Sequence, residues 1–593
     1  MKNIKFSAAI ILTVLFFLQS CKKESPNNSG ASTVTTVSTG VGTGPGGSIV
    51  AGIDPAVSST QAFFLNNWTA KTFAVPGTTQ TDSKPSANGA VSVTVDLSQI
   101  TTKVSNYLFG NNINPYMGQM VTAPVLMNNV TALAPNILRA PGGSLSDVYF
   151  WNADGTTITA PADAPANLLN SSGVSSAAGY WFGNNTATWT LTVDNYYKVL
   201  QQTNSKGLIT VNYGYARYGT GPTPVQTAAH LAANWVRYDN GRTQFWEVGN
   251  ESYGSWEAGY KIDVTKNQDG QPAIITGALY GTHFKVFADS MRAAAAQVGN
   301  TNIKIGAFLT TSSDVVNTQG GVNNWNAGVL SAAGNSPDFY VEHNYYTPYG
   351  QNSTAVTILG TPGPGTAAMM SWVATSIQNA GVTQKPIAFD EWNIQATGSD
   401  QNVSNIAGLH AVMVLGEALK NKISMAGRWD LANGWANGDD QGMFNIGDEP
   451  GAVAVWNPRP VYYYMYFFQK YFGDRMVGST VSGSTDIVSY GSSFSSGQAG
   501  VILVNTGSSD HVVTVAFNNF SIGANYYFYR LNGGTDNSPF SRQVFVNSTG
   551  PSNGISGGPG NFASLPAYTG SVSGGITLTV PAYGAVFLVV DHQ

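Results

Sequence analysis

The sequence predicts a (β/α)8 barrel followed by an all-β sandwich, and three observations support this fold class. Eight short apolar runs of strand length recur between residues 105 and 475, and helical patterns alternate with them. After residue 476 the helical periodicity ends, and strands alternate with Gly, Ser and Asn turns up to residue 593. The chain has 593 residues, 42% of them hydrophobic, which suffices for one barrel and one smaller domain.

The barrel strands are predicted at residues 108–113, 137–140, 208–213, 245–251, 303–308, 339–345, 386–392 and 425–431. Helices are predicted between them at residues 191–203, 227–238, 283–298 and 406–421. In the helix at 283–298, Phe284, Phe287 and Met291 have helical spacing, and Gly299 gives a stop signal. Strand and helix thus alternate as in a parallel barrel, which would place catalytic groups at the carboxyl ends of the strands.

The sandwich strands are predicted at residues 499–505, 511–517, 524–531 and 585–590. Another strand is predicted at residues 91–97, where apolar and polar residues alternate. It belongs to an N-terminal segment, residues 61–104, and is expected to join the sandwich from the other side of the barrel.

The N-terminus predicts export. Lys2 and Lys5 precede an apolar run at residues 6–18, so residues 1–20 are typical of a signal peptide. The run ends in Leu-Gln-Ser-Cys, which resembles the bacterial lipobox, so we expect lipid on Cys21 and an outer-membrane-associated lipoprotein, periplasmic or facing the cell surface. An incidental cysteine after an ordinary signal is the alternative. Residues 21–60, rich in Ser, Thr and Gly, are expected to form a flexible tether.

Composition limits the partners. Charged residues make up 10% of the chain and the net charge is −5, so nucleic acid is not an expected partner. One cysteine excludes an internal disulfide, and six histidines without zinc-ligand spacing lead us to expect no metal and no cofactor. The oligomeric state stays open.

The chemistry is concentrated at the ends of two predicted strands. Residues 245–251 run as a strand into Asn250 and Glu251, and residues 386–392 carry Glu391 beside an aromatic residue. Both glutamates would lie at one rim of the barrel. Two carboxylates that face one pocket can divide the roles of acid and nucleophile, which is what cleavage of a glycosidic bond requires.

These motifs resemble those of a known enzyme clan. WEVGNE at 246–251 and IAFDEWN at 387–393, on the fourth and seventh strands, resemble the acid/base and nucleophile motifs of retaining (β/α)8 glycosidases. The closer resemblance is to the α-L-arabinofuranosidase family, through Arg-Ala-Pro-Gly-Gly at 139–143 and His-Asn-Tyr-Tyr at 343–346. It covers residues 90–593 and implies a barrel followed by a β-sandwich. Ser144 and the segment 252–257 depart from that family's pattern.

The resemblance implies roles for the residues of the two motifs. Glu251 would be the general acid/base, with its pKa raised by a nearby negative charge, and Glu391 the nucleophile, about 5 to 5.5 Å away. Asn250 would hydrogen-bond the 2-hydroxyl of the sugar.

Further residues would hold the nucleophile or the sugar. Arg139 would keep Glu391 ionised, and His343 or Tyr345 could do so by hydrogen bonding. The alternatives are a structural ion pair for Arg139 and a core position for His343. Candidates for stacking on sugar rings are Trp392, Trp429 and Trp256.

Three functions are compatible with this sequence. The first is a lipid-anchored retaining glycosidase that acts on arabinofuranosyl side chains of hemicellulose or pectin. The second is an endo-acting β-glucanase or xylanase of the same clan. The third is a non-catalytic surface glycan-binding protein. Two buried carboxylates argue against this function, because their desolvation is costly and a binding protein has no use for them.

Overall fold

The computed structural model describes residues 49–86, 89–312 and 321–593. The predicted signal peptide, Cys21 and the first part of the predicted tether lie outside the described residues. Within the described ranges, every helix falls short of the length or the hydropathy of a membrane span.

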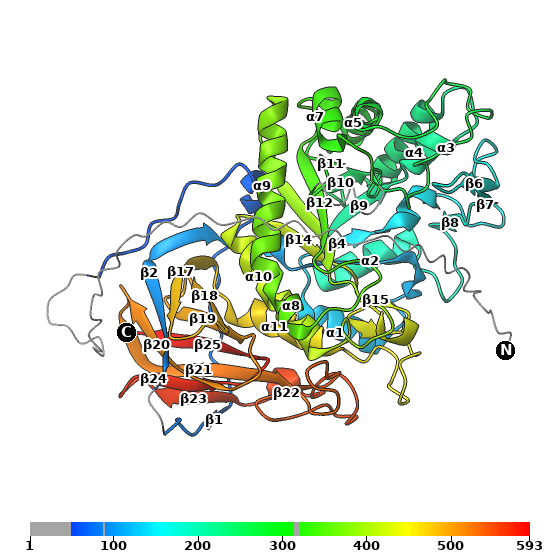
Figure 1. Ribbon diagram of the computed structural model, residues 1–593. Helices are drawn as coiled ribbons and strands as arrows, with labels where there is room; N and C mark the ends of the chain where they lie inside the picture. Colours follow the sequence, from blue (N-terminus) through cyan, green and yellow to red (C-terminus); the bar gives the residue numbers. More distant parts are fainter. Residues whose placement is uncertain (1–48, 87–88, 313–320) are drawn as a thin grey trace, which may run out of the picture. The chain divides into compact units, whose positions relative to one another are not determined.

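Eight parallel strands close into a barrel in the order β10-β11-β12-β13-β14-β3-β4-β9 (Figure 1). In chain order they are β3 (Gly110–Asn112), β4 (Ile137–Ala140), β9 (Lys206–Val211), β10 (Phe245–Val248), β11 (Lys304–Phe308), β12 (Phe339–Tyr345), β13 (Ile387–Asn393) and β14 (Met425–Arg428). Each overlaps one of the eight predicted strands, so the predicted barrel is confirmed.

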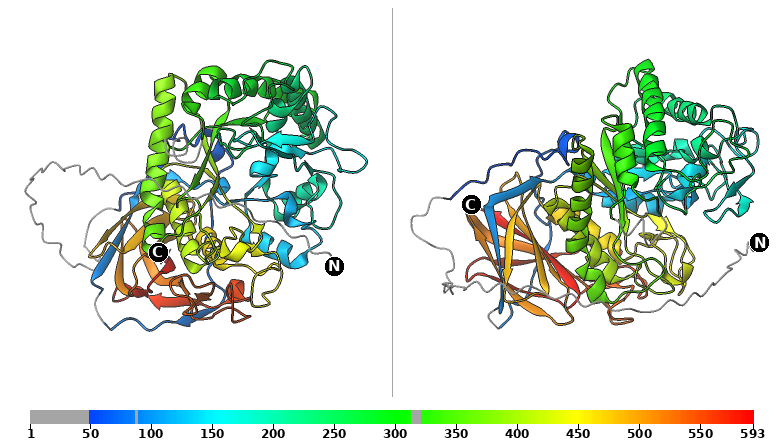
Figure 2. Two further views of the ribbon diagram at one scale, coloured as in Figure 1. Left: turned by 45° about the vertical axis from the view of Figure 1, so that its right-hand side comes forward. Right: turned by 45° about the horizontal axis from the view of Figure 1, so that its top comes forward.

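At least one helix follows each barrel strand, and the helices α5, α7 and α9 lie on the outside of the barrel (Figures 1 and 2). The helices are α1 (Pro124–Leu133), α2 (Val193–Thr203), α3 (Gly214–Tyr218), α4 (Pro224–Asp239), α5 (Gly277–Gln297), α7 (Trp325–Ala333), α8 (Ala355–Gly360), α9 (Pro362–Ala380), α10 (Asn405–Lys420) and α11 (Pro460–Tyr471). Helix α5 begins before the predicted residue 283, because the Thr276 side chain accepts a hydrogen bond from the Leu279 amide at 3.1 Å and caps an earlier turn.

The C-terminal strands, together with two strands that precede the barrel, form one continuous, mainly antiparallel sheet of eleven strands. They are β1 (Thr79–Thr81), β2 (Val91–Lys103), β17 (Arg475–Ser482), β18 (Ile487–Ser493), β19 (Ala499–Asn505), β20 (His511–Asn518), β21 (Ile522–Gly533), β22 (Val544–Val546), β23 (Ala567–Ser571), β24 (Ile576–Val580) and β25 (Gly584–His592). The predicted strand at 91–97 is part of β2, which pairs antiparallel with β17 and parallel with β20. Strands from distant positions in the sheet share one apolar core, as a sandwich requires.

The sheet domain packs against the last helix of the barrel. Phe467 of α11 lies 4.6 Å from the ring of Tyr529 and 6.0 Å from that of Phe587. Residues of the sheet and of the barrel helices therefore belong to one continuous core.

The N-terminal segment closes the amino-terminal end of the barrel. The ring of Phe64, in η1 (Ala62–Leu65), lies 5.5 Å from Phe245 and 5.6 Å from Phe339, the first residues of β10 and β12. Aromatic side chains that no barrel strand supplies thus cover this end of the barrel.

The prediction that the tether reaches residue 60 is wrong for its last residues. Asp54 forms ion pairs with Arg475 at 2.5 Å and Lys103 at 3.2 Å. Thr60 donates a hydrogen bond to the Lys422 carbonyl at 2.9 Å and accepts one from the Ile387 amide at 2.9 Å. The sequence argument considered apolar burial alone, whereas this segment is attached through polar contacts.

Candidate active site

Glu251 and Glu391 meet at the carboxyl ends of the barrel strands. Glu391 lies within β13, and Glu251 follows β10. Three atoms lie within 4.8 Å of one another, namely one carboxylate oxygen of Glu251, one of Glu391, and Nδ1 of His343. The side chains are 14% and 6% exposed, so water reaches both. Oxygens this close agree with a retaining carboxylate pair, whose carboxyl groups lie about 5 to 5.5 Å apart.

Arg139, in β4, forms hydrogen bonds with residues of both motifs. Its Nη1 donates to Glu391 Oε2 at 2.9 Å, and its Nη2 donates to Asn250 Oδ1 at 2.8 Å. Its Nε donates to Glu247 Oε1 at 2.5 Å. Burial opposes the charge of Arg139, but Glu247, Asp390 and Glu391 outweigh burial and raise its pKa. The structure therefore brings Arg139 to Glu391, as the sequence predicts.

Two side chains of β12 reach the carboxylate pair. The Tyr345 hydroxyl donates to Glu391 Oε1 at 2.7 Å. His343 Nδ1 lies 2.9 Å from Glu251 Oε1 and 3.7 Å from Glu391 Oε2, and its Nε2 lies 3.2 Å from Asp390 Oδ1. Tyr345 thus contacts the predicted nucleophile, whereas the nearest carboxylate to His343 is that of the predicted acid/base.

The contact between His343 and Glu251 reverses the predicted order of the carboxylate pKa values. Burial raises the pKa of Glu391, against the charges of His343 and Arg139. Burial acts in the same direction on Glu251, but the hydrogen bond and charge of His343 lower the pKa of Glu251. Burial would also lower the pKa of His343, yet Glu391, Asp390 and Glu251 raise it to about 10. In this state the acidic proton near Glu251 is therefore held by His343.

The side-chain amide of Asn250 is fixed on both sides. Besides accepting from Arg139, it donates to Glu257 Oε1 at 2.9 Å. The Ser144 hydroxyl donates to the same Glu257 oxygen at 2.8 Å. Ser144 and Glu257 belong to the two segments that depart from the family pattern, so these departures contact each other beside the active site.

The three candidate tryptophans lie in different surroundings. Trp392 is 1% exposed and packs against Phe389 with ring centroids 6.3 Å apart, so the expected stacking on sugar is wrong for Trp392. Trp429 is half-buried, and a Cβ at Gly143 would come within 2.3 Å of its ring, which explains why glycine is needed there. Trp256 is 41% exposed, and its Nε1 donates to Glu251 Oε2 at 2.8 Å.

Sequence reasoning missed Asp390, because side chains of a regular strand alternate and Asp390 should point away from Glu391. The pairing of β13 with β14 shifts register between Phe389 and Trp392, and that of β12 with β13 shifts next to His343. These irregularities bring adjacent carboxylates towards the same histidine, a use of bulges that is common beside active sites.

Asp430 and Asp147 were also missed, since no sequence motif links them to the glutamates. Asp430 accepts hydrogen bonds from Tyr116 at 2.9 Å and from Asn114 at 2.6 Å. Asp147 accepts from the backbone amides of Tyr213 at 3.1 Å and Asn250 at 3.2 Å, and thereby joins the ends of two barrel strands.

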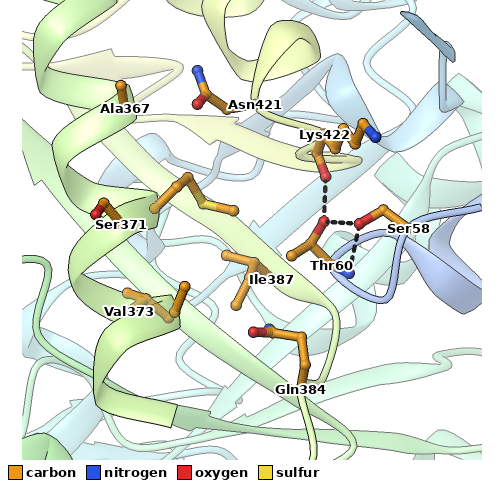
Figure 3. A pocket seen from close by; sticks show the side chains of 11 residues that line it. Ser58, Thr60, Ala367, Ser371, Val373, Gln384, Ile387, Asn421 and Lys422 are labelled. Atoms are coloured by element: carbon orange, nitrogen blue, oxygen red, sulfur yellow. Dashed lines mark hydrogen bonds between the residues drawn. The ribbon is translucent and has the colours of Figure 1, made fainter. Parts of the chain in front are cut away.

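A cavity of about 380 Å³ lies at the other end of β13 (Figure 3). Thr60, Ser371 and Ile387 are among its lining residues, and Ile387 is the first residue of β13. None of the lining residues is a carboxylate. The chemistry of the carboxylate pair therefore belongs to the opposite end of the barrel. At that end, Glu251, His343 and Glu391 form a group, among the described residues, that could hold a metal ion.

Comparison with solved structures supports the fold. The GH51 α-L-arabinofuranosidase from Thermotoga petrophila RKU-1 is 18% identical, with a TM-score of 0.57, over 84% of this chain and 100% of that chain. The family 51 α-L-arabinofuranosidase from Bifidobacterium longum is 13% identical, with a TM-score of 0.57, over 86% and 100% of the chains. A xyloglucanase of glycoside hydrolase family 44 from Paenibacillus polymyxa is 13% identical, with a TM-score of 0.53, over 84% and 99%.

The chain thus has the fold of these enzymes, a parallel eight-stranded barrel with an antiparallel sheet domain. No family model and no curated protein matches it.

Proposed function

We propose that this protein is a retaining glycoside hydrolase that works by double displacement. The observation that carries the proposal is the pair of solvent-accessible carboxylates, Glu251 and Glu391, whose oxygens approach within 4.8 Å at the carboxyl ends of barrel strands. The fold shared with glycoside hydrolases of known structure agrees with this function.

In the first step, a Glu391 oxygen attacks the anomeric carbon while the bond to the leaving oxygen breaks. The hydrogen bonds from Arg139 and Tyr345 favour the carboxylate form of Glu391, which is the attacking form. Glu251 gives its proton to the leaving oxygen. That proton can come from His343, whose Nδ1 lies 2.9 Å from Glu251 Oε1. Its transfer turns the histidine cation and the Glu251 carboxylate into two neutral groups, and this becomes favourable when substrate displaces water from the site.

In the second step, water attacks the anomeric carbon of the glycosyl ester, and Glu251, now a carboxylate, accepts a proton from that water. The ester bond breaks and releases Glu391. Asn250, with its amide held by Arg139 and Glu257, is placed to hydrogen-bond the sugar 2-hydroxyl.

Arabinofuranosides are the first proposed substrates, as side chains of hemicellulose or pectin. The resemblance of the motifs and the two GH51 structures support them. An endo-acting glucanase or xylanase is the second candidate, supported by the xyloglucanase structure and by the exposed Trp256 beside Glu251.

Hydrolysis of 4-nitrophenyl arabinofuranoside, xyloside and glucoside, and of arabinan, arabinoxylan and xyloglucan, tests the function. Release of sugar by the wild-type protein, and its loss in Glu391→Ala, is the expected result. If polysaccharides bind to the protein but none of these substrates is cleaved, the glycan-binding alternative replaces the enzyme.

We further propose that the protein is exported and anchored to the outer membrane by lipid on Cys21. The basic residues, the apolar run and the lipobox-like sequence before Cys21 support this proposal. Mass spectrometry of the mature protein should find an acylated N-terminal cysteine, and Cys21→Ser should release the protein from the membrane fraction. An unmodified Cys21 in the mature protein would contradict the proposal.

A further inference from the structure

Three aromatic side chains form a line beside the active site, which we call the aromatic track. Tyr116 lies in η3 (Pro115–Met117), Trp181 in β8 (Trp181–Phe182), and Trp189 just before α2. The rings of Tyr116 and Trp181 are 6.3 Å apart, and those of Trp181 and Trp189 are 5.8 Å apart. All three follow β3 or β4, so they belong to the loops at the carboxyl ends of the barrel strands.

The inner end of the aromatic track is linked to the surroundings of the predicted nucleophile through Asp430. The Tyr116 hydroxyl donates to Asp430 Oδ2 at 2.9 Å. Burial raises the pKa of both Tyr116 and Asp430, and the charge of Glu391 adds to the rise in each. Asp430 also raises the pKa of Tyr345, which itself donates to Glu391. The inner end is therefore within electrostatic range of Glu391.

Unpartnered oxygens lie at this inner end. Asn114 and Asp430 are each 0% exposed, and Oδ1 of each has no hydrogen-bond partner among the described residues. Buried polar atoms without partners are rare in folded proteins, since each costs free energy. Both oxygens are acceptors, and at 0% exposure they make the inner end polar without being open to a sugar hydroxyl.

The outer end of the aromatic track is exposed on a fixed backbone. Trp189 is 57% exposed, and Trp181 is half-buried. The Trp189 carbonyl accepts from the Gly118 amide at 3.2 Å, and the Leu191 amide donates to the Pro115 carbonyl at 2.6 Å. These contacts hold the tryptophan beside the loop that carries Tyr116. The exposed ring thus stays next to the rest of the track.

We propose that the aromatic track binds a neutral glycan chain, so that the substrate is held over several consecutive sugar units and not only at the bond that is cleaved. Aromatic faces attract the polarised C–H groups of sugar rings, and the outer tryptophan of the track is open to solvent. The proposed mechanism needs Glu391 as a carboxylate, and that negative charge disfavours uronic acids at the inner end. This inference rests on the proposed function and names its substrate class.

Binding without turnover tests the aromatic track. In a Glu391→Ala background, affinity electrophoresis in gels that contain arabinoxylan, arabinan or xyloglucan measures binding. Trp181→Ala and Trp189→Ala should each weaken binding about tenfold, as loss of an anchoring aromatic does. Trp372→Ala is the matched control, because Trp372 is 37% exposed on the outer helix α9 and should leave binding unchanged. Thermal unfolding checks that each variant folds.

The outcomes separate this inference from the proposed function. Tryptophan-dependent binding without any hydrolysis by the wild-type protein would leave the track standing and remove the enzyme. Hydrolysis with binding unchanged in both tryptophan variants, or no binding of any of the three polysaccharides, would overturn the track. In active protein, Trp189→Ala should lower kcat/KM several-fold more on polysaccharide than on an aryl monoglycoside. If polygalacturonate binds as tightly as arabinoxylan, the proposed preference of the aromatic track for neutral glycans is refuted.

Discussion

The core of the sheet domain and the carboxyl ends of the barrel strands bury side chains of opposite character. The sheet core consists of apolar side chains, such as Val93 of β2 and Leu503 of β19, both 0% exposed. The barrel end buries Arg139, Asp390 and Glu391 instead. Burial of apolar groups stabilises the fold, whereas burial of charges costs free energy that ion pairs only partly offset. The comparison separates a region built for stability from one built for chemistry.

Backbone geometry differs in the same way. Strand β19 pairs with β18 and β25 in unbroken register. Strands β12 and β13 carry register shifts, and Glu251 has a φ of +38°, in the left-handed region that residues with a side chain seldom occupy. Strained backbone of this kind persists where surrounding contacts hold it. Here Asp147 accepts from the amide of the neighbouring Asn250.

The largest effect should come from the carboxylate pair itself. Glu391→Ala removes the attacking atom and should lower kcat/KM by about 10⁴-fold or more on every substrate. Glu251→Ala should keep hydrolysis of aryl glycosides with good leaving groups, because these need no protonation, and azide should restore turnover. Steady-state kinetics on aryl and alkyl glycosides measures both. Identical behaviour of the two variants would contradict the division of roles.

A second pair of substitutions compares the two regions directly. Arg139→Met leaves Glu247 and Glu391 buried without their cation, and should cost about 3–5 kcal/mol of unfolding free energy together with most of the activity. Leu503→Ala leaves a cavity in the sheet core and should cost about 2–5 kcal/mol with kcat unchanged. Urea unfolding and kinetics on the same samples measure both quantities. If folded Leu503→Ala lost kcat, the sheet core would contribute to catalysis and the contrast between the two regions would be contradicted.

Glu257 offers a smaller and sharper test of the active site. Burial, with the charges of Asp147 and Glu251, raises the pKa of Glu257 well above its usual range, which favours the protonated carboxyl group. Glu257→Gln keeps an acceptor for Asn250 and Ser144 and should retain kcat within about threefold, whereas Glu257→Ala should lose about tenfold. A large loss in Glu257→Gln would mean that the charged form is needed.

Two buried histidines should respond to pH in opposite directions. Despite burial, carboxylates raise the pKa of His343 from 6.5 to about 10, so its stabilisation is complete below pH 6.5 and is lost as the pH rises to about 10. Burial and the charge of Arg428 lower the pKa of His410 from 6.5 to about 3, so its stabilisation is present above pH 6.5 and is lost as the pH falls towards 3.

Melting temperatures measured against pH check this contrast. The advantage of wild type over His343→Gln should shrink from pH 6 to about 10, and the advantage over His410→Gln should shrink from pH 7 to about 4. Parallel pH profiles for the two variants would show that His343 is not held as a cation.

The sequence was sufficient for features that depend on local pattern. Apolar runs of strand length located all eight barrel strands, and the two glutamates were found because each follows such a run. Contacts between distant segments could not be predicted in this way. Glu257 is separated from Ser144 by more than a hundred residues, and only the fold shows that they share a hydrogen bond.

Other differences have local causes. The partner of His343 depends on irregular pairing of β12 and β13, which no periodicity indicates. Trp392 follows Glu391 directly and was expected in the active site, but the register shift between Phe389 and Trp392 brings both rings together in the core.

The covalent intermediate provides the most direct test of the central claim. A 2-deoxy-2-fluoro glycoside with a good leaving group, matched to the sugar that the protein hydrolyses, should react once and leave a stable glycosyl ester. Mass spectrometry of the digested protein should find the added sugar on Glu391. A label on Glu251, or no covalent adduct on a protein that turns over the parent glycoside, would contradict the proposed mechanism.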